Sequence, residues 1–166
     1  SASELTIKVT GYRWKWSYEY LTYKDDNDVG VFFFSNLKTP PEQFNTPVLK
    51  AGLFPYGTAA DNYGKEAPEK DFNYMLDVDQ PLYIPSGMKV RFLVTAEDVI
   101  HSFYLPDFGF KKDAIPGFVN EVWTNVPEGQ EGTYFGQCAE LCGKNHAFMP
   151  ILSLIHISEP TRRHLI

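Results

Sequence analysis

The sequence predicts an all-β fold, a sandwich or barrel of antiparallel strands. Apolar and polar residues alternate with a period of two in several short segments, which is typical of strands with one buried face. Turn residues recur about every ten residues between these segments. No segment has the convincing period of an amphipathic helix. Short strands at this spacing indicate a sandwich or barrel.

The first predicted strand begins at Leu5, and Ile7 and Val9 continue its apolar face. Gly11 interrupts the alternation, and a second strand is predicted over residues 12–20. One face of this second strand carries five aromatic side chains: Tyr12, Trp14, Trp16, Tyr18 and Tyr20. Because aromatic rings bury large areas, five on one face is an unusual amount for a single strand.

Residues 24–73 predict an irregular excursion from the core, because proline and glycine are too dense there for long regular elements. The segment is too short and too broken to form a core of its own, so it is not a second domain. Strand signals return over residues 74–78, 82–84, 89–95, 117–124 and 132–136. We therefore expect one domain over residues 1–151 that contains this excursion.

The composition supports a compact domain and excludes several functions. The chain has 166 residues, and 43% of them are hydrophobic, an ordinary share for a globular fold. The formal net charge of −6 argues against a nucleic-acid partner, because phosphate binding needs clustered Lys and Arg. An acidic surface instead suits a basic protein partner. Only two Cys are present, which excludes a disulfide-rich scaffold.

Residues 152–166 are predicted to be a non-native tail. Residues 152–162 read LSLIHISEPTR, which resembles, residue for residue, the translation of a transposase-type sequencing adapter. The alternative is a native last strand, whose alternating residues would be Ile151, Ser153, Ile155 and Ile157.

The residues that can carry metal chemistry are concentrated in one segment. Of the two Cys and four His in the chain, His156 and His164 fall in the predicted tail. The others, together with a methionine, follow the spacing Cys-x3-Cys-x3-His-x2-Met with one distant histidine upstream; they are Cys138, Cys142, His146, Met149 and His101. Thiolate, imidazole and thioether suit copper far better than magnesium or calcium. A second thiolate also allows two sulfurs to bridge two copper ions.

Three other interpretations of these residues stay open. Cys138 and Cys142 could form a disulfide in a metal-free sandwich that acts as a binding module, although three intervening residues seldom permit good disulfide geometry. A Cys2His2 set could bind zinc, against which Met149 argues. A mononuclear cupredoxin carrier would hold one copper ion, against which the second thiolate argues.

Four segments resemble the copper-A domain of cytochrome c oxidase subunit II, bacterial versions most of all. They are WKWSYEY at 14–20, EDVIHSF at 97–103, KKDAIPG at 111–117 and the ligand segment at 136–150. The last of these is highly specific. The resemblance covers residues 11–20 and 75–151, and it implies a cupredoxin-like Greek-key sandwich or barrel.

The resemblance implies a role for each candidate ligand. Cys138 and Cys142 would bridge two copper ions, and His101 and His146 would each bind one of them. Met149 would be a weak axial ligand.

Two further residues gain roles from the resemblance. Glu140 would offer its backbone carbonyl to copper, while its carboxylate would reach a magnesium or manganese ion shared with the catalytic subunit. Trp14 would be the ring at which electrons from cytochrome c arrive, whereas Trp16 is expected to pack in the core.

The family's function would follow from these roles. The domain would accept electrons from cytochrome c and pass them to the haem of catalytic subunit I, so it would belong to an oxidase without itself reducing oxygen. Basic cytochrome c would dock on Asp79, Glu97 and Asp98. The domain would lie on the periplasmic face of the bacterial inner membrane, with a membrane anchor expected upstream of Ser1.

One alternative and two departures qualify this expectation. A nitrous-oxide-reductase-type copper-A domain shares the ligand spacing but typically has Trp where this chain has Glu140. Lys15 stands where an aromatic residue is common, beside Trp14, and would weaken docking of a basic partner locally. Phe118 replaces a frequent Arg, which removes one polar contact towards the catalytic subunit.

Overall fold

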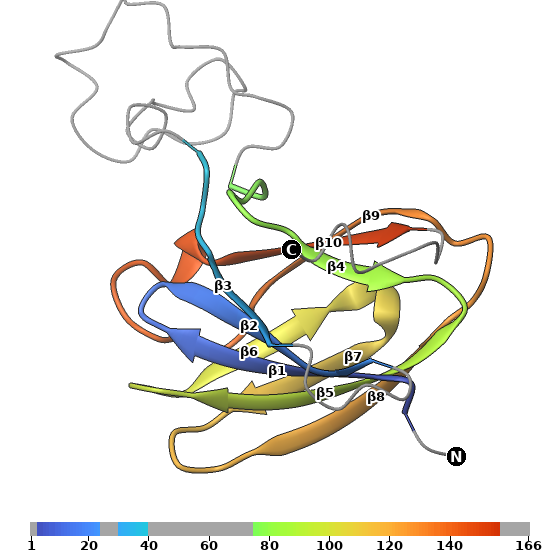
Figure 1. Ribbon diagram of the computed structural model, residues 1–166. Coiled ribbons are helices and arrows are strands. Elements are labelled where there is room, and N and C mark those ends of the chain that lie inside the picture. The colour runs from blue at the N-terminus through green and yellow to red at the C-terminus, as the bar shows by residue number, and fades with distance from the viewer. Residues whose placement is uncertain (1–2, 24–29, 40–74, 157–166) are drawn as a thin grey trace, which may run out of the picture.

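The computed structural model is a β-sandwich of two layers (Figure 1). The structure describes residues 3–23, 30–39 and 75–156. One five-stranded sheet has the order β3 (Val31–Ser35), β2 (Lys15–Tyr23), β1 (Leu5–Tyr12), β5 (Met88–Ala96) and β8 (Asn120–Val126). The other has the order β4 (Leu82–Pro85), β10 (Pro150–His156), β9 (Gly132–Cys138), β6 (His101–Leu105) and β7 (Phe110–Ala114). The predicted all-β sandwich is confirmed.

The core lies between the two sheets and follows the predicted alternation. Strand β5 buries every second side chain and leaves those between them partly exposed. Phe92 of β5 contacts Phe103 of β6 across the interior, with ring centroids 5.7 Å apart. Burying each large apolar side chain of this kind stabilises the fold by about 1.5–3 kcal/mol.

Strand direction differs from the prediction. Strand β1 pairs with β5 in parallel, and β10 pairs with β4 in parallel, whereas we expected antiparallel strands throughout. The reason is that side chains alternate between the faces of a strand in both arrangements, so the period of two does not report direction.

The aromatic segment is divided between two strands. Gly11 lies inside β1, which ends at Tyr12, and Trp14 belongs to the turn that leads into β2. The predicted break at Gly11 is therefore wrong, and the chain turns at residues 13–14 instead. The three aromatic residues of β2 that were expected on one face are buried in the core: Trp16, Tyr18 and Tyr20.

Other boundaries also moved. Of the predicted strand at 74–78, the structure describes residues 75–78, which form a single bridge between Val78 and Leu37. Met75 has a φ of 63°, which extended backbone does not adopt. Strand β8 begins at Asn120 and not at Gly117, since Gly117 lies in a turn with a φ of 74°. The sequence patterns did not reveal β6 or β7.

Within the predicted excursion, residues 24–29 and 40–74 lie outside the described part of the chain, and residues 31–35 form the edge strand β3. Among residues 3–23, 30–39 and 75–156, the remaining regular elements are two 3-10 helices, η3 (Pro106–Phe108) and η4 (His146–Phe148). In the described ranges, no helix is long and apolar enough to cross a bilayer.

The last strand continues past the predicted end of the domain at Ile151. Strand β10 runs to His156, between β9 and β4. Leu152 and Ile155 are each 5% exposed, so these residues pack as the alternative interpretation of a last strand expects. The adapter origin of residues 152–162 stays a prediction, because packing does not report the source of a codon.

Candidate metal centre

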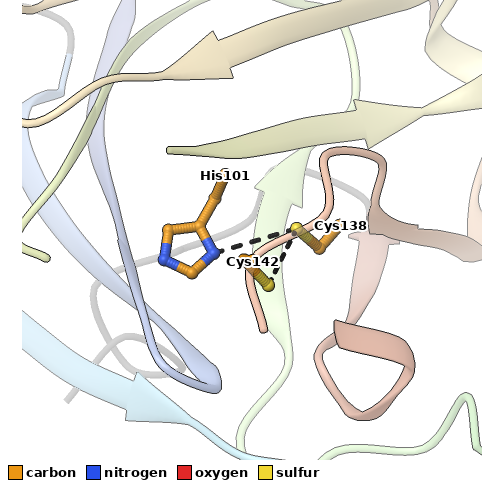
Figure 2. A group of neighbouring side chains, drawn as sticks. All are labelled: His101, Cys138 and Cys142. Carbon is orange, nitrogen blue, oxygen red and sulfur yellow. Dashed lines mark hydrogen bonds between the residues drawn. The ribbon is translucent and has the colours of Figure 1, made fainter. Parts of the chain in front are cut away.

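The candidate metal ligands gather at one end of the sandwich. His101 is the first residue of β6, and Cys138 is the last residue of β9. The loop that follows carries Cys142, and η4 then supplies His146 just before Met149 leads into β10. Figure 2 shows His101, Cys138 and Cys142 pointing toward one another from β6, the end of β9 and the loop that follows it.

The two cysteine sulfurs form the centre of this group. The two Sγ atoms lie 3.9 Å apart. Nδ1 of His101 lies 3.8 Å from Sγ of Cys138, and Nδ1 of His146 lies 3.5 Å from Sγ of Cys142. Each sulfur therefore has its own imidazole nitrogen.

Two further donor atoms complete the group. Sδ of Met149 lies 3.6 Å from Sγ of Cys142, and the thiol of Cys138 donates to the backbone carbonyl of Glu140 at 3.3 Å. The Glu140 residue itself is exposed. The structure thus brings together all six residues that the sequence singled out as ligands.

The centre is shielded from solvent. His101 is 0% exposed, Cys138 and Cys142 are each 5% exposed, and Met149 is 2% exposed. His146 is half-buried. Two buried thiols beside a buried imidazole are a donor set that is typical of metal sites.

The Asp98 carboxylate holds the far side of the His101 ring. Nε2 of His101 donates to Oδ1 of Asp98 at 2.9 Å. The same carboxylate accepts from the backbone N–H groups of Arg13 and Val99, each at 2.7 Å. A neutral imidazole that donates through Nε2 keeps its lone pair on Nδ1, which faces Cys138.

The pKa directions reflect these contacts. Burial lowers the pKa of His101, but hydrogen bonds with Cys138 and Asp98 outweigh it and raise that pKa above its ordinary value. Burial likewise raises the pKa of Cys138, yet its bond with His101 and the backbone N–H of Ser102 bring it below the ordinary value. Burial and the neighbouring Cys138 charge raise the pKa of Cys142 to about 12.

Trp14 lies against the ligand loop. A Cβ added to Gly143 would come 3.3 Å from Cζ2 of Trp14, and Gly143 has a φ of 119°. Only glycine adopts this conformation without strain, so the loop can bring its backbone onto the indole. Trp14 therefore lies close beside the residue that follows Cys142.

The predicted docking residues are placed differently from one another. Asp79, Glu97 and Asp98 are all exposed residues, as docking requires, but only Asp98 is tied to the metal centre. The Asp98 side chain is 26% exposed and is bonded to His101 and Arg13. Sequence reasoning assigned Asp98 to docking and missed its contact with His101, although its position three residues upstream was a signal.

The two departures from the family pattern are both at the surface. Nζ of Lys15 lies 4.0 Å from the centroid of the Phe34 ring and 5.7 Å from that of Tyr12. Phe118 is 58% exposed. Lys15, which follows Trp14 in the sequence, therefore holds its positive charge over the rings of Phe34 and Tyr12.

The proposed disulfide is not formed. Both cysteines are free thiols, and their 3.9 Å separation is far longer than the ~2.05 Å of an S–S bond. The fold and the donor set together define a β-sandwich with a buried thiolate and imidazole centre that suits a soft metal ion.

The comparisons identify the family. Residues 61–155 match the model of the family described as cytochrome c oxidase subunit II, periplasmic domain. This chain therefore belongs to the family of cytochrome c oxidase subunit II periplasmic domains. A probable cytochrome c oxidase subunit 2 of Rickettsia bellii (strain RML369-C) is 43% identical over 149 residues, which are 90% of this chain and 44% of that protein. The chain thus spans less than half the length of the curated relatives that it matches.

Solved structures agree with this assignment. The crystal structure of the periplasmic domain of subunit II of cytochrome oxidase (CoxB) of Bradyrhizobium japonicum is 34% identical, with a TM-score of 0.70, over 99% of this chain and 93% of that one. A second structure shows a subunit II periplasmic domain in a mixed disulfide intermediate with a thioredoxin-like protein; it is 32% identical, with a TM-score of 0.65, over 99% of this chain and 91% of that one. The predicted cupredoxin-like fold is confirmed by these neighbours.

Proposed function

We propose that this chain is the electron-transfer domain of a cytochrome c oxidase subunit II and that it holds two copper ions. The observation that carries the proposal is the pair of free thiols 3.9 Å apart, each with its own imidazole Nδ1. A mononuclear cupredoxin would have one thiolate at its centre, and a second buried sulfur at this distance would then have no purpose.

The donor set fits such a pair. Metal–thiolate bonds are about 2.3 Å long, so one ion can contact two sulfurs only when they are less than about 4.6 Å apart. The 3.9 Å separation satisfies this limit. The thioether of Met149 beside Cys142 and the carbonyl of Glu140 beside Cys138 supply further donors. A thioether favours copper over zinc.

The ligand roles follow from these contacts. Cys138 and Cys142 would bridge the two ions, with His101 on one and His146 on the other. Met149 would be a weak ligand, and the backbone carbonyl of Glu140 would supply a further one. The exposed carboxylate of Glu140 is free to reach a magnesium or manganese ion at the boundary with the catalytic subunit.

When bound, the copper pair supplies one-electron redox chemistry with small structural change. The protein's contribution is to hold the donors rigidly, because burial and hydrogen bonds limit how far each ligand can move. Electrons from cytochrome c would arrive near Trp14, whose ring lies beside Gly143, the residue after Cys142. They leave towards the haem of catalytic subunit I, so the domain relays electrons and reduces no oxygen itself.

The surroundings of the domain follow from this role. It would face the periplasm of a bacterium, at the inner membrane that holds the catalytic subunit. Thiols in an oxidising compartment are prone to disulfide formation. A relative has been captured in a mixed disulfide with a thioredoxin-like protein, and a reductant of that class would keep Cys138 and Cys142 reduced until copper binds.

Electron uptake tests this function. The copper-loaded chain is mixed with reduced cytochrome c in a stopped-flow instrument, and the second-order rate is measured for the wild type, Trp14→Phe and Trp123→Phe. Trp123 is a surface tryptophan on β8 that is 40% exposed and serves as the matched control. We expect Trp14→Phe to slow uptake at least tenfold and Trp123→Phe to leave it unchanged. Equal rates for all three proteins would contradict the assignment of Trp14.

A further inference from the structure

Two residues directly opposite each other on β1 and β2 enclose the ring of His101. Gly11 and Trp16 are register partners in the antiparallel ladder. Side chains of directly opposite residues lie on the same face of a sheet. Trp16 is fully buried in the interior, so the open side of Gly11 faces the interior as well.

The His101 ring occupies the space that a side chain at position 11 would need. A Cβ added to Gly11 would lie 2.8 Å from Cδ2 of His101, 2.9 Å from its Cγ and 3.1 Å from its Cβ. These separations are below van der Waals contact, so the imidazole would have to move. His101 is 0% exposed, and a buried ring cannot escape into solvent.

Trp16 limits the ring from another direction. The two ring centroids lie 6.0 Å apart, with an angle of 61° between the planes. Nε1 of Trp16 donates to the backbone carbonyl of Met149 at 3.4 Å. The indole therefore contacts the His101 ring and also the backbone of a second candidate ligand, Met149, which directly precedes β10.

We propose that the Gly11–Trp16 pair is a positioning pair, which fixes the imidazole of His101 with Nδ1 toward Cys138 before any metal binds. Asp98 holds Nε2 of the ring and Sγ of Cys138 lies 3.8 Å from Nδ1, but both contacts lie at the edge of the ring and leave it room to tilt. Gly11 and Trp16 remove this freedom by packing. The metal consequence rests on the proposed function, whereas the packing itself does not.

A double-mutant cycle in the metal-free full chain tests the packing. Gly11→Ala is made in the wild type and in a His101→Ala background, and the urea midpoint is measured for each protein. We expect Gly11→Ala to lower the midpoint in the wild type and to have little effect without the imidazole. An equal decrease in both backgrounds would overturn the proposal, because the cause would then be the backbone of β1. If Gly11→Ala alone does not fold, a folded double variant supports the proposal and an unfolded one overturns it.

Copper binding gives an independent readout. Substitution of a residue that orients a metal-ligating histidine typically lowers metal affinity 10–100-fold. We therefore expect Gly11→Ala to weaken copper binding at least about tenfold. Val90→Ala is the control, because Val90 pairs with Leu5 at the opposite end of β1 and also loses core packing. Equal losses in both variants would overturn the positioning role. If the wild-type chain binds no copper, the proposed function fails, and the urea cycle still decides the packing.

Discussion

The Asp98 carboxylate accepts a 2.9 Å hydrogen bond from Nε2 of His101, while Nδ1 of the same ring lies 3.8 Å from Sγ of Cys138. The His101 side chain therefore connects Asp98, in the surface loop before β6, with the buried sulfur of Cys138. The contact fixes the tautomer of His101 that can bind a metal through Nδ1. It also assigns Asp98 a task that is distinct from attracting a partner protein.

Substitution of Asp98 separates these two tasks. Asp98→Asn keeps an acceptor for Nε2 but loses the charge, whereas Asp98→Leu loses both. We expect Asp98→Leu to weaken copper binding about 10–100-fold and Asp98→Asn to weaken it much less, as measured by competition with a copper chelator. Glu97→Leu is the matched control, since Glu97 is exposed next to Asp98. Similar copper affinity in all three variants would show that Asp98 does not orient His101.

The two thiols should ionise at different pH values in the metal-free chain. Hydrogen bonds hold the pKa of Cys138 below its ordinary value, while burial raises the pKa of Cys142 to about 12. The folded state therefore keeps a proton on Cys142 that the unfolded chain releases above about pH 8.5, so Cys142 reduces stability as the pH rises from there towards 12. Thiolate absorbance at neutral to alkaline pH should first report Cys138, and Cys138→Ser should abolish that first step. Loss of the first step in Cys142→Ser instead would contradict this order.

Lys15 should oppose a basic electron donor. Lys15 follows Trp14 in the sequence, and its ammonium group is held over the Phe34 ring. Its positive charge therefore has a fixed position near the proposed point of electron arrival. We expect Lys15→Gln to raise the uptake rate from basic cytochrome c about two- to fivefold at low salt, with the difference disappearing at high salt. Lys89→Gln is the control. It makes the same change of net charge near the Leu5 end of β1, whereas Lys15 pairs with Tyr12 at the opposite end of that strand. An equal gain in both variants would show an effect of net charge alone.

The last strand should contribute to stability whatever the source of its codons. Ile155 is 5% exposed and pairs with Ile84 of β4 and Gly132 of β9. Ile155→Ala should lower the free energy of unfolding by about 2–5 kcal/mol, because it leaves a cavity in the core. Urea denaturation measures this, with Leu154→Ala, a half-buried neighbour, as the control. A change below about 0.5 kcal/mol would indicate that residues 152–156 do not pack in solution.

The grouping of the candidate ligands was easier to predict from the sequence than the strands around them. Cys138, Cys142, His146 and Met149 share one short segment, and their soft donors point to a metal without any knowledge of the fold. His101 was found because few histidines were available. Local spacing is sufficient for such a segment because one loop places most of its residues.

Contacts between distant segments could not be predicted in this way. Gly11 of β1 lies close against the ring of His101, which begins β6. No local sequence pattern reports which strand will lie opposite a glycine. Gly11 was therefore interpreted as a strand break. The parallel pairing of β1 with β5 was missed for the same reason, since periodicity reports which face is buried and not which strand is the neighbour.

The copper content of the chain and of Cys142→Ser tests the central claim most directly. Metal analysis and electron paramagnetic resonance are carried out on the full chain after copper loading under reducing conditions and removal of excess metal. The proposed centre predicts two copper ions per wild-type chain, with one unpaired electron shared between both nuclei in the mixed-valence form. Cys142→Ser, which keeps one sulfur, should lose that shared signal. One copper ion per wild-type chain, with a spectrum from a single copper nucleus, would contradict the account.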